Sequence, residues 1–223
     1  MRNLVAVIEI SAVGASRTRS TIGSLEQDCG PEPAAGPRPN IVWLSVEDMS
    51  PWIGPYGDTT VPTPNLDRLA QEGCRFNNAY VTHAVCSASR ASFLTGLYPF
   101  QNGQIGLATH KYSMCRNWPN IPSLLKQQGY RTGIIGKLHV NPAEAFPFDF
   151  EALTGSNFND RPMHKFAELA GGFLEASEAP FFLMVNYPDA HFPLLTTQHG
   201  LPERPMTAKD VRQMLPEVGI DSP

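Results

Sequence analysis

Apolar runs alternate with helix-like segments along the chain from residue 40 to residue 187. Three of these runs, NIVWLSV at 40–46, YRTGIIG at 130–136 and FFLMVNY at 181–187, are typical of strands buried in a parallel sheet. CRFNNAYVTH at 74–83 is predicted to be a further strand. The alternation of strands with helices predicts an α/β fold, with a mostly parallel sheet and helices on both faces.

Four segments carry the punctuation or the period of helices. They are TPNLDRLAQEG at 63–73, CSASRASFLTG at 86–96, IPSLLKQQG at 121–129 and PMHKFAELAGGFLEASE at 162–178. The first has a Thr cap, a Pro at the first helical position and a terminal Gly, which are ordinary boundary signals. In the second, Cys86 falls at the amino terminus of the predicted helix.

The two ends of the chain have a different composition from the middle. Residues 1–39 are predicted to be a leader or disordered linker: the first part only faintly resembles a signal peptide, because Glu9 interrupts its apolar run, and the rest is rich in Pro and Gly. The ordered domain is expected at 40–195, followed by an irregular tail at 196–223. The sequence contains no run of about 20 apolar residues, so no transmembrane segment is predicted. The cellular compartment of the protein is not determined by these features.

Composition narrows the class of partner. The chain has 223 residues, of which 17% are charged, and a formal net charge of −4. One globular unit is expected at this length. The absence of a basic excess argues against nucleic acid and favours small or carbohydrate-like partners. The four cysteines form no CxxC pair, so neither a zinc ribbon nor a thioredoxin-like site is predicted.

Reactive side chains follow three of the predicted strands. Ligand sites in such sheets lie beyond the carboxyl ends of the strands, so these side chains are expected at one edge. They are Glu47 and Asp48 after the first strand, Lys137 and His139 after the second, and Asp189 and His191 after the third.

The mixture of groups favours one kind of chemistry. Carboxylates suit a hard cation such as Ca²⁺ or Mg²⁺, while Lys, Arg and a helix amino terminus attract a tetrahedral oxyanion. A nucleophile at the start of the helix would face the central atom, and an imidazole would protonate the leaving group. Together they predict hydrolysis of a sulfate or phosphate ester.

Cys86 has three other possible interpretations. A tyrosine-phosphatase-like loop needs Cys and Arg six positions apart, whereas Cys86 and Arg90 are four apart. A Cys–His hydrolase would need neither the carboxylate pair nor the Lys. A buried structural cysteine remains an alternative on these residues alone, because free Cys is among the most often buried residue types.

The segment CSASRASFLTG resembles the signature of the sulfatase family, C-x-P/A-S-R followed by L-T-G. Further similarity lies in the strand before Glu47 and Asp48, in TPNLDRLAQEG, in GYRTGIIGKLH and in PFFLMVNYPDAH, and it covers roughly residues 39–195. The segments around Cys86 and Lys137 are most similar to family members that act on N-sulfated glucosamine. The resemblance implies an alkaline-phosphatase-like fold and a sulfate ester or sulfamate hydrolase acting on sulfated glycans.

The resemblance also implies roles for individual residues. Cys86 would be oxidised to formylglycine by a formylglycine-generating or anaerobic sulfatase-maturating enzyme, and the hydrate of the aldehyde would attack sulfur and form a sulfated enzyme intermediate. Arg90 would hold the hydrate, and Lys137 and His139 would bind the hydrate or the sulfate oxygens. His191 would bind sulfate or protonate the leaving group.

A calcium site is implied by the same resemblance. Glu47 and Asp48, with Cys86, match its amino-terminal ligands, although the family more often has Asp where this chain has Glu47. Ser89 and Ala88 belong to the motif that the maturating enzyme reads, and Ala88 replaces a commoner Pro.

Some elements of the family pattern find no match after His191. These are a later Asp-Asn metal pair, a further Lys and a smaller carboxy-terminal domain, so the chain is expected to be an amino-terminal part of a sulfatase with low activity on its own. Two alternatives stay open: a non-catalytic homologue that binds an anion, and a phosphohydrolase of the same superfamily, which would normally use Ser or Thr where this chain has Cys86.

Overall fold

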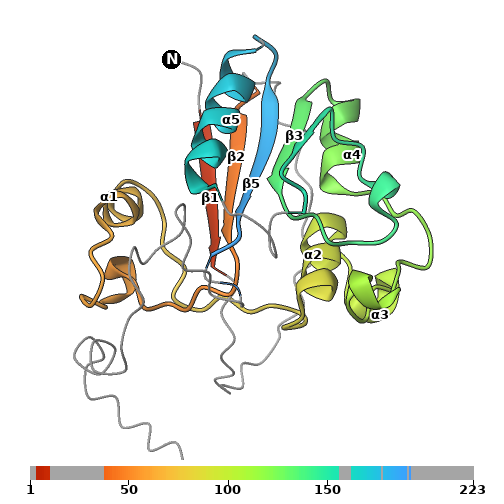
Figure 1. Ribbon diagram of the computed structural model, residues 1–223, viewed down its shortest axis with the longest axis horizontal. Helices are drawn as coiled ribbons and strands as arrows, with labels where there is room; N and C mark the ends of the chain where they lie inside the picture. The colour runs from red at the N-terminus through yellow and green to blue at the C-terminus, as the bar shows by residue number, and fades with distance from the viewer. Residues whose placement is uncertain (1–3, 11–37, 156–161, 177, 190, 192–223) are drawn as a thin grey trace, which may run out of the picture.

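A five-stranded parallel sheet forms the centre of the computed structural model, with the strand order β1-β2-β5-β3-β4 (Figure 1). The three strands predicted from the apolar runs are confirmed, and β4 is an additional short edge strand. The strands are β1 (Leu4–Ile10), β2 (Asn40–Val46), β3 (Arg131–Gly136), β4 (Phe150–Ala152) and β5 (Phe181–Tyr187). The structure describes residues 4–10, 38–155, 162–176, 178–189 and 191.

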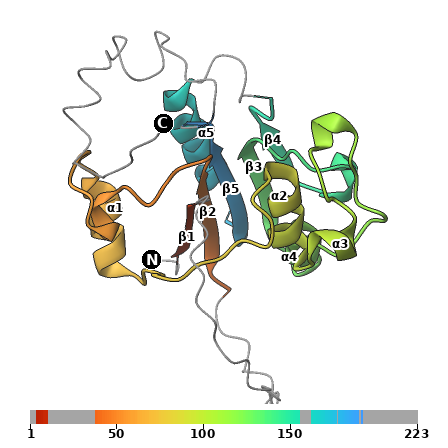
Figure 2. The same ribbon diagram turned by 90° about the horizontal axis from the view of Figure 1, so that it is seen from below.

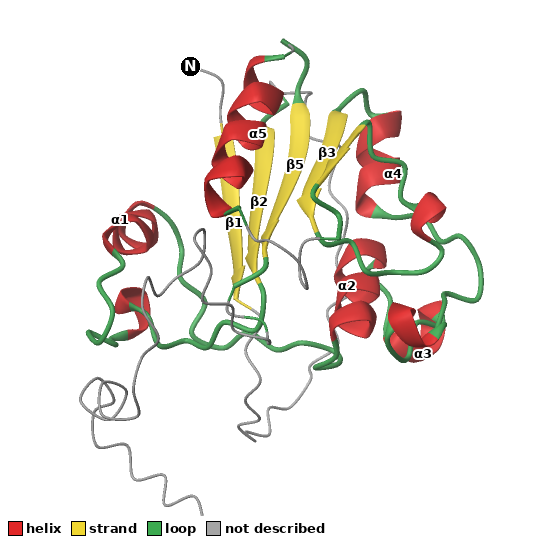
Figure 3. Cartoon of the chain, in the orientation of Figure 1, coloured by secondary structure: helices red, strands yellow, loops and turns green. Residues whose placement is uncertain are grey.

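The four predicted helices are present as α1 (Pro64–Glu72), α2 (Cys86–Thr95), α4 (Ile121–Gln127) and α5 (Met163–Glu175), whereas the short helix α3 (Pro99–Asn102) was not predicted. Helix α5 covers one face of the sheet, and α2 and α4 cover the other (Figures 1 and 3). Short 3-10 turns occur at η1 (Gly54–Tyr56), η2 (Ala108–His110) and η3 (Ala143–Ala145). Among the described residues, no helix is both long and apolar enough to cross a bilayer.

Alternation along β5 divides the core into two layers, because successive side chains of a strand point to opposite faces. Phe182 and Met184 pack with α2 and α4 residues such as Leu94 and Leu125. Leu183 and its neighbours on the other face pack against α5, as part of a cluster that includes Phe166. A strand buried on both faces explains why FFLMVNY is almost continuously apolar.

Two glycines shape the backbone next to the future site. Gly96 ends α2 with φ +70°, the left-handed conformation that glycine adopts without strain. Gly136 ends β3 with φ +93°, and a Cβ at this position would lie 2.3 Å from the carbonyl oxygen of Asn186. Only glycine fits there, and the turn that it permits leads directly into Lys137.

Two expectations from the sequence are corrected. Residues 74–83 are not a strand: they form an exposed connection leading to α2, and Asn77 and Asn78, which favour turns, interrupt the alternation. Residues 1–39 are not wholly a leader or linker, because Leu4–Ile10 pairs residue by residue with Asn40–Val46 as β1. The run LVAVIEI is rich in β-favouring residues, and it supplies a parallel edge strand. The predicted tail at 196–223 lies outside the described residues.

Helix α1 and η1 lie to one side of the sheet, away from α2, α3 and α4 (Figures 1 and 2). A chain of hydrogen bonds joins them: the Gly54 amide donates to Thr63 Oγ1 at 3.0 Å, and that hydroxyl donates to Asp67 Oδ1 at 3.0 Å. The loop after β2 is therefore tied to the first helix, while the residues directly after β2 remain at the edge of the sheet.

Candidate active site

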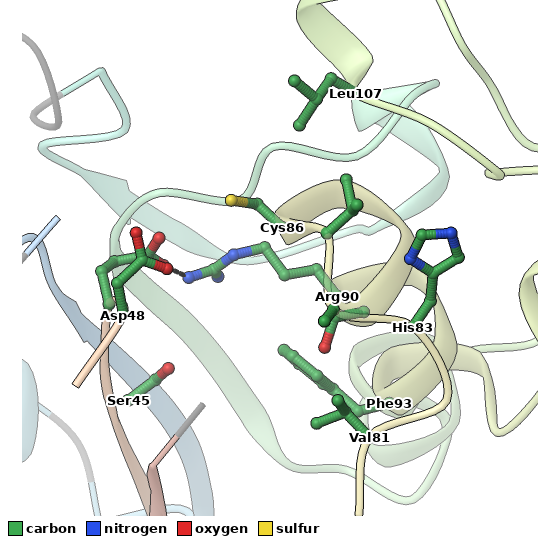
Figure 4. Close-up of a pocket in the computed structure, with 12 residues that line it drawn as sticks. Ser45, Asp48, Val81, His83, Cys86, Arg90, Phe93 and Leu107 are labelled. Atoms are coloured by element: carbon green, nitrogen blue, oxygen red, sulfur yellow. Dashed lines mark ion pairs between the residues drawn. The ribbon is translucent and has the colours of Figure 1, made fainter. Parts of the chain in front are cut away.

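The carboxyl ends of β2, β3 and β5 meet the amino terminus of α2, as the parallel topology requires. A cavity of about 500 Å³ opens at this place. Glu47, Asp48, Cys86 and Arg90 line it, and Figure 4 shows Arg90 and Cys86 between Asp48 on one side and His83 on the other. A pocket therefore lies at the predicted edge of the sheet, and Glu47 and Asp48 are the strand-end residues that line it.

Glu47 is the centre of a buried charge cluster. Its side chain is 5% exposed, and its two carboxylate oxygens have different partners. Oε1 forms an ion pair with the Arg90 guanidinium, and Oε2 accepts a hydrogen bond from Lys137 Nζ at 3.0 Å. Arg90 also donates to the Lys137 carbonyl at 2.7 Å. One carboxylate therefore holds two cations that belong to different elements.

The amino terminus of α2 places Cys86 beside these cations. Val85 is the N-cap and provides no side-chain cap, so the first amide groups of the helix are available to an anion. Ser89 N already donates to Val85 O at 2.8 Å, as part of the first turn. Ser87 Oγ accepts from the Ala108 amide at 2.8 Å and anchors the turn to η2. Helix dipole, Arg90 and Lys137 all favour negative charge at this point.

Burial lowers the pKa of Lys137 to about 8, in opposition to Cys86 and Asp48, which favour its charged form, and in concert with Arg90. The side chains of Lys137 and Cys86 are within hydrogen-bonding reach of each other. At neutral pH Lys137 is therefore still a cation, and it lies beside the Cys86 thiol.

His139 is an imidazole held in its neutral form. Burial, and after it the charges of Lys137, Arg90 and His191, lower its pKa to about 4. Both ring nitrogens are buried and have no hydrogen-bond partner among the described residues. Its backbone has φ +55°, an uncommon conformation for a residue with a side chain. A neutral ring with two unsatisfied nitrogens is suited to bind a polar group that enters the pocket.

His191 reaches the pocket from the end of β5. Its Nε2 atom lies 3.8 Å from Asp48 Oδ2. Ligand atoms of His191, Glu47 and Cys86 also lie within 4.8 Å of one another, the arrangement of a candidate metal cluster. Asp48 has φ +51° and a side chain that is 49% exposed, so it faces the solvent side of the pocket.

The residues predicted to hold a metal, Glu47, Asp48 and Cys86, meet only part of what a Ca²⁺ ion requires. Ca²⁺ prefers about 6–8 oxygen ligands, whereas two carboxylates face this pocket among the described residues, and Glu47 already pairs with two cations. Within the same residues the cluster of possible ligands contains His191 in place of Asp48.

Several residues in or beside the pocket were not anticipated from the sequence. Ser45 and Asn186 face each other in register on β2 and β5, and both are buried. Asn186 Nδ2 donates to the Lys137 carbonyl at 2.9 Å and so holds the turn after β3. The signal was available: each is a polar residue one position before the end of an otherwise apolar strand. His83, by contrast, enters through a loop whose path only the fold determines.

Comparisons with known proteins give one consistent result. The family model described as "Sulfatase" matches residues 39–213. Human N-sulphoglucosamine sulphohydrolase is 40% identical over 164 residues, which are 70% of this chain and 32% of the human protein. The ulvan-active sulfatase of Formosa agariphila is 32% identical over 170 residues, covering 74% of this chain and 27% of that protein.

A solved structure of a protein in complex with its substrate, D-glucosamine-2-N,6-O-disulfate, superposes with a TM-score of 0.62 at 28% identity. The match covers 71% of this chain and 36% of that one. The chain therefore spans about a third of the length of these relatives.

Proposed function

Because this chain belongs to the sulfatase family, we propose that its pocket hydrolyses a sulfate ester or a sulfamate, with Cys86, oxidised to formylglycine, as the nucleophile. The observation that carries the proposal is the position of Cys86, at the amino terminus of α2 and beside two buried cations. Such a site attracts an anion and presents its central atom to the group at position 86.

Each of the remaining residues has a proposed role that follows from its position in the pocket. Arg90 and Lys137 bind the anionic oxygens, and Glu47 holds both cations in place. His139 is neutral at pH 7, so it can donate a hydrogen bond to the sulfate or accept one from the nucleophile. His191, beside Asp48, protonates the leaving oxygen or nitrogen as the bond to sulfur breaks. When formed, formylglycine supplies a hydrated aldehyde whose oxygen attacks sulfur.

A divalent metal, which the family resemblance implies to be Ca²⁺, would be held by Glu47 and Asp48 with further oxygen ligands from outside the described residues. It would supply positive charge opposite the sulfate. Because the described residues fit such an ion only in part, we assign it no step in the reaction.

The proposed substrate class is a sulfated glycan. The most similar relatives include a sulphohydrolase of N-sulphoglucosamine, and a related structure holds a glucosamine that carries both N- and O-sulfate. The pocket supports such a substrate, because the apolar side chains of Val81, Phe93 and Leu107 line it together with the charged ones (Figure 4). A sugar ring with its sulfate would have both kinds of surface available.

The test is expression with a formylglycine-generating enzyme. The peptide that contains Cys86 should show the mass of the aldehyde or its hydrate, and the protein should release sulfate from an aryl sulfate or from N-sulfated glucosamine above background. Cys86→Ala should abolish turnover, and Cys115→Ala, an exposed cysteine outside the pocket, should not. An unmodified thiol in the presence of the active maturating enzyme would overturn the proposed nucleophile.

A further inference from the structure

A second cavity adjoins the candidate active site along α2. Its volume is about 340 Å³, and it shares Val81, Ser89 and Phe93 with the first cavity. The first cavity lies at the amino-terminal end of α2, with Cys86, and the second extends to Gly96, which ends the helix. The two cavities are therefore neighbouring compartments along one helix, and none of the residues assigned to sulfate binding or catalysis lines the second.

A buried hydroxyl in the second cavity lacks a partner. Ser92 is 7% exposed and lines the cavity, and its Oγ atom forms no hydrogen bond with any described residue. A buried polar atom without a partner is costly, and an apolar occupant would leave that cost in place. The hydroxyl group of a ligand would remove it. Ser89, on the same side of α2, lines both cavities and adds a second hydroxyl.

Two exposed aromatic rings stand at the same cavity. Tyr80 is 69% exposed and Tyr98 is 53% exposed, although both line the cavity. Tyr98 is held against Phe100, with ring centroids 5.4 Å apart and an angle of 8° between the rings. Stacking on Phe100 restricts the Tyr98 ring, so its position is partly preformed. An aromatic ring with a hydroxyl at its edge offers an apolar face and a polar tip to the same ligand.

We propose that the second cavity binds the sugar next to the sulfated sugar, so that the substrate is a glycan of at least two units that lies along α2. This inference rests on the proposed function. A sugar ring has apolar C–H faces that stack on Tyr98 and hydroxyl groups that bond Ser92, and it thus matches both features of the cavity. Because the compartments share Ser89 and Phe93, linked sugars occupy both without leaving the helix.

The test measures binding by the unmodified chain with calorimetry, so that it does not depend on turnover. The probes are N-sulfated glucosamine, a disaccharide with that sugar at its non-reducing end, and the same disaccharide without sulfate. The sulfated disaccharide should bind about tenfold more tightly than the monosaccharide, a gain of the size that one stacked ring and one hydrogen bond give. The unsulfated disaccharide should bind more weakly than either.

Substitutions separate the subsite from the sulfate site. Tyr98→Ala and Ser92→Ala should each remove most of the disaccharide gain and leave the affinity for the monosaccharide unchanged. The matched control is Phe76→Ala, which removes an aromatic ring that is 72% exposed and lies outside both cavities; it should change neither affinity.

Equal binding of monosaccharide and disaccharide, or a disaccharide gain that survives both substitutions, would overturn the subsite and leave the proposed function intact. Failure of both sulfated sugars to bind, in a chain that is folded by circular dichroism, would overturn the proposed function and the subsite with it.

Discussion

Replacing Glu47 by Gln removes the single carboxylate that lies between two buried cations. At 3.0 Å from Lys137 Nζ, the attraction is about 5–6 kcal/mol for an effective dielectric constant of about 20. The cost of taking the charges out of water offsets part of this energy, but removing one partner of a buried pair still costs about 3–5 kcal/mol, because the other charge stays buried. Arg90, on the other oxygen, loses its partner in the same variant.

Urea denaturation at pH 7, followed by tryptophan fluorescence and circular dichroism, measures the effect. With a slope of about 2 kcal/mol per molar urea, the midpoint of Glu47→Gln should fall by about 1.5–2.5 M. The matched control is Asp48→Asn, the next carboxylate along the chain. Its side chain is 49% exposed, so the expected loss is below about 1 kcal/mol.

The pH dependence adds a second criterion. The pKa of Lys137 is about 8, so the wild-type protein loses this cation as the pH rises through 8, and the Glu47–Lys137 ion pair with it. The difference in stability between wild type and Glu47→Gln should therefore be smaller at pH 9.5 than at pH 7. A loss no larger than that of Asp48→Asn at pH 7 would refute the buried triad.

The remaining predictions concern backbone fit, histidine titration and metal. Gly136→Ala should destabilise the protein by more than about 3 kcal/mol in thermal or urea unfolding, because a Cβ there meets the Asn186 carbonyl at 2.3 Å. The control is Gly57→Ala, since Gly57 has a similar φ of +92° but nothing within 4 Å of the added Cβ. It should cost only about 1–2 kcal/mol. The NMR titration of His139 should give a pKa of about 4. Because the pKa of histidine in the unfolded chain is about 6.5, the stability that the neutral His139 ring contributes is complete above pH 6.5 and is lost as the pH falls toward 4. A pKa of 6 or higher would show that the ring is solvated. Calcium added in calorimetry should bind with a Kd weaker than about 10⁻⁴ M, because few oxygens face the pocket; submicromolar binding would show that the described residues hold a more complete site.

The sequence alone determined most of the local elements and the place of Cys86, the proposed nucleophile, in them. Strands β2 and β5 match the apolar runs at 40–46 and 181–187 residue for residue. Strand β5 is buried on both faces, which demands continuous hydrophobicity. The start of α2 at Cys86 was also predicted. Periodicity and caps are properties of neighbouring residues, so they are visible without the fold.

Local pattern was misleading where no partner element was available. Residues 74–83 have strand-like composition, yet they remain an exposed connection, since a strand exists only through hydrogen bonds to another strand. The reverse holds for Leu4–Ile10: its apolar run was predicted to be part of a leader, but the edge of β2 provides a partner for the whole segment.

Only the tertiary structure decided what each polar residue at the strand ends does. The sequence placed Glu47 among metal ligands and Lys137 among sulfate ligands, whereas in the fold the two are also ion-paired to each other across 90 positions of sequence. This contact exists because β5 inserts between β2 and β3, which brings the ends of those strands to one edge beside α2. Strand order is a long-range property, set by which faces bury the most apolar surface together, and no local period encodes it. The same reason explains why the contact of Asn186 with the Lys137 carbonyl and the cavity at Ser92 emerged only when the strands and α2 were packed.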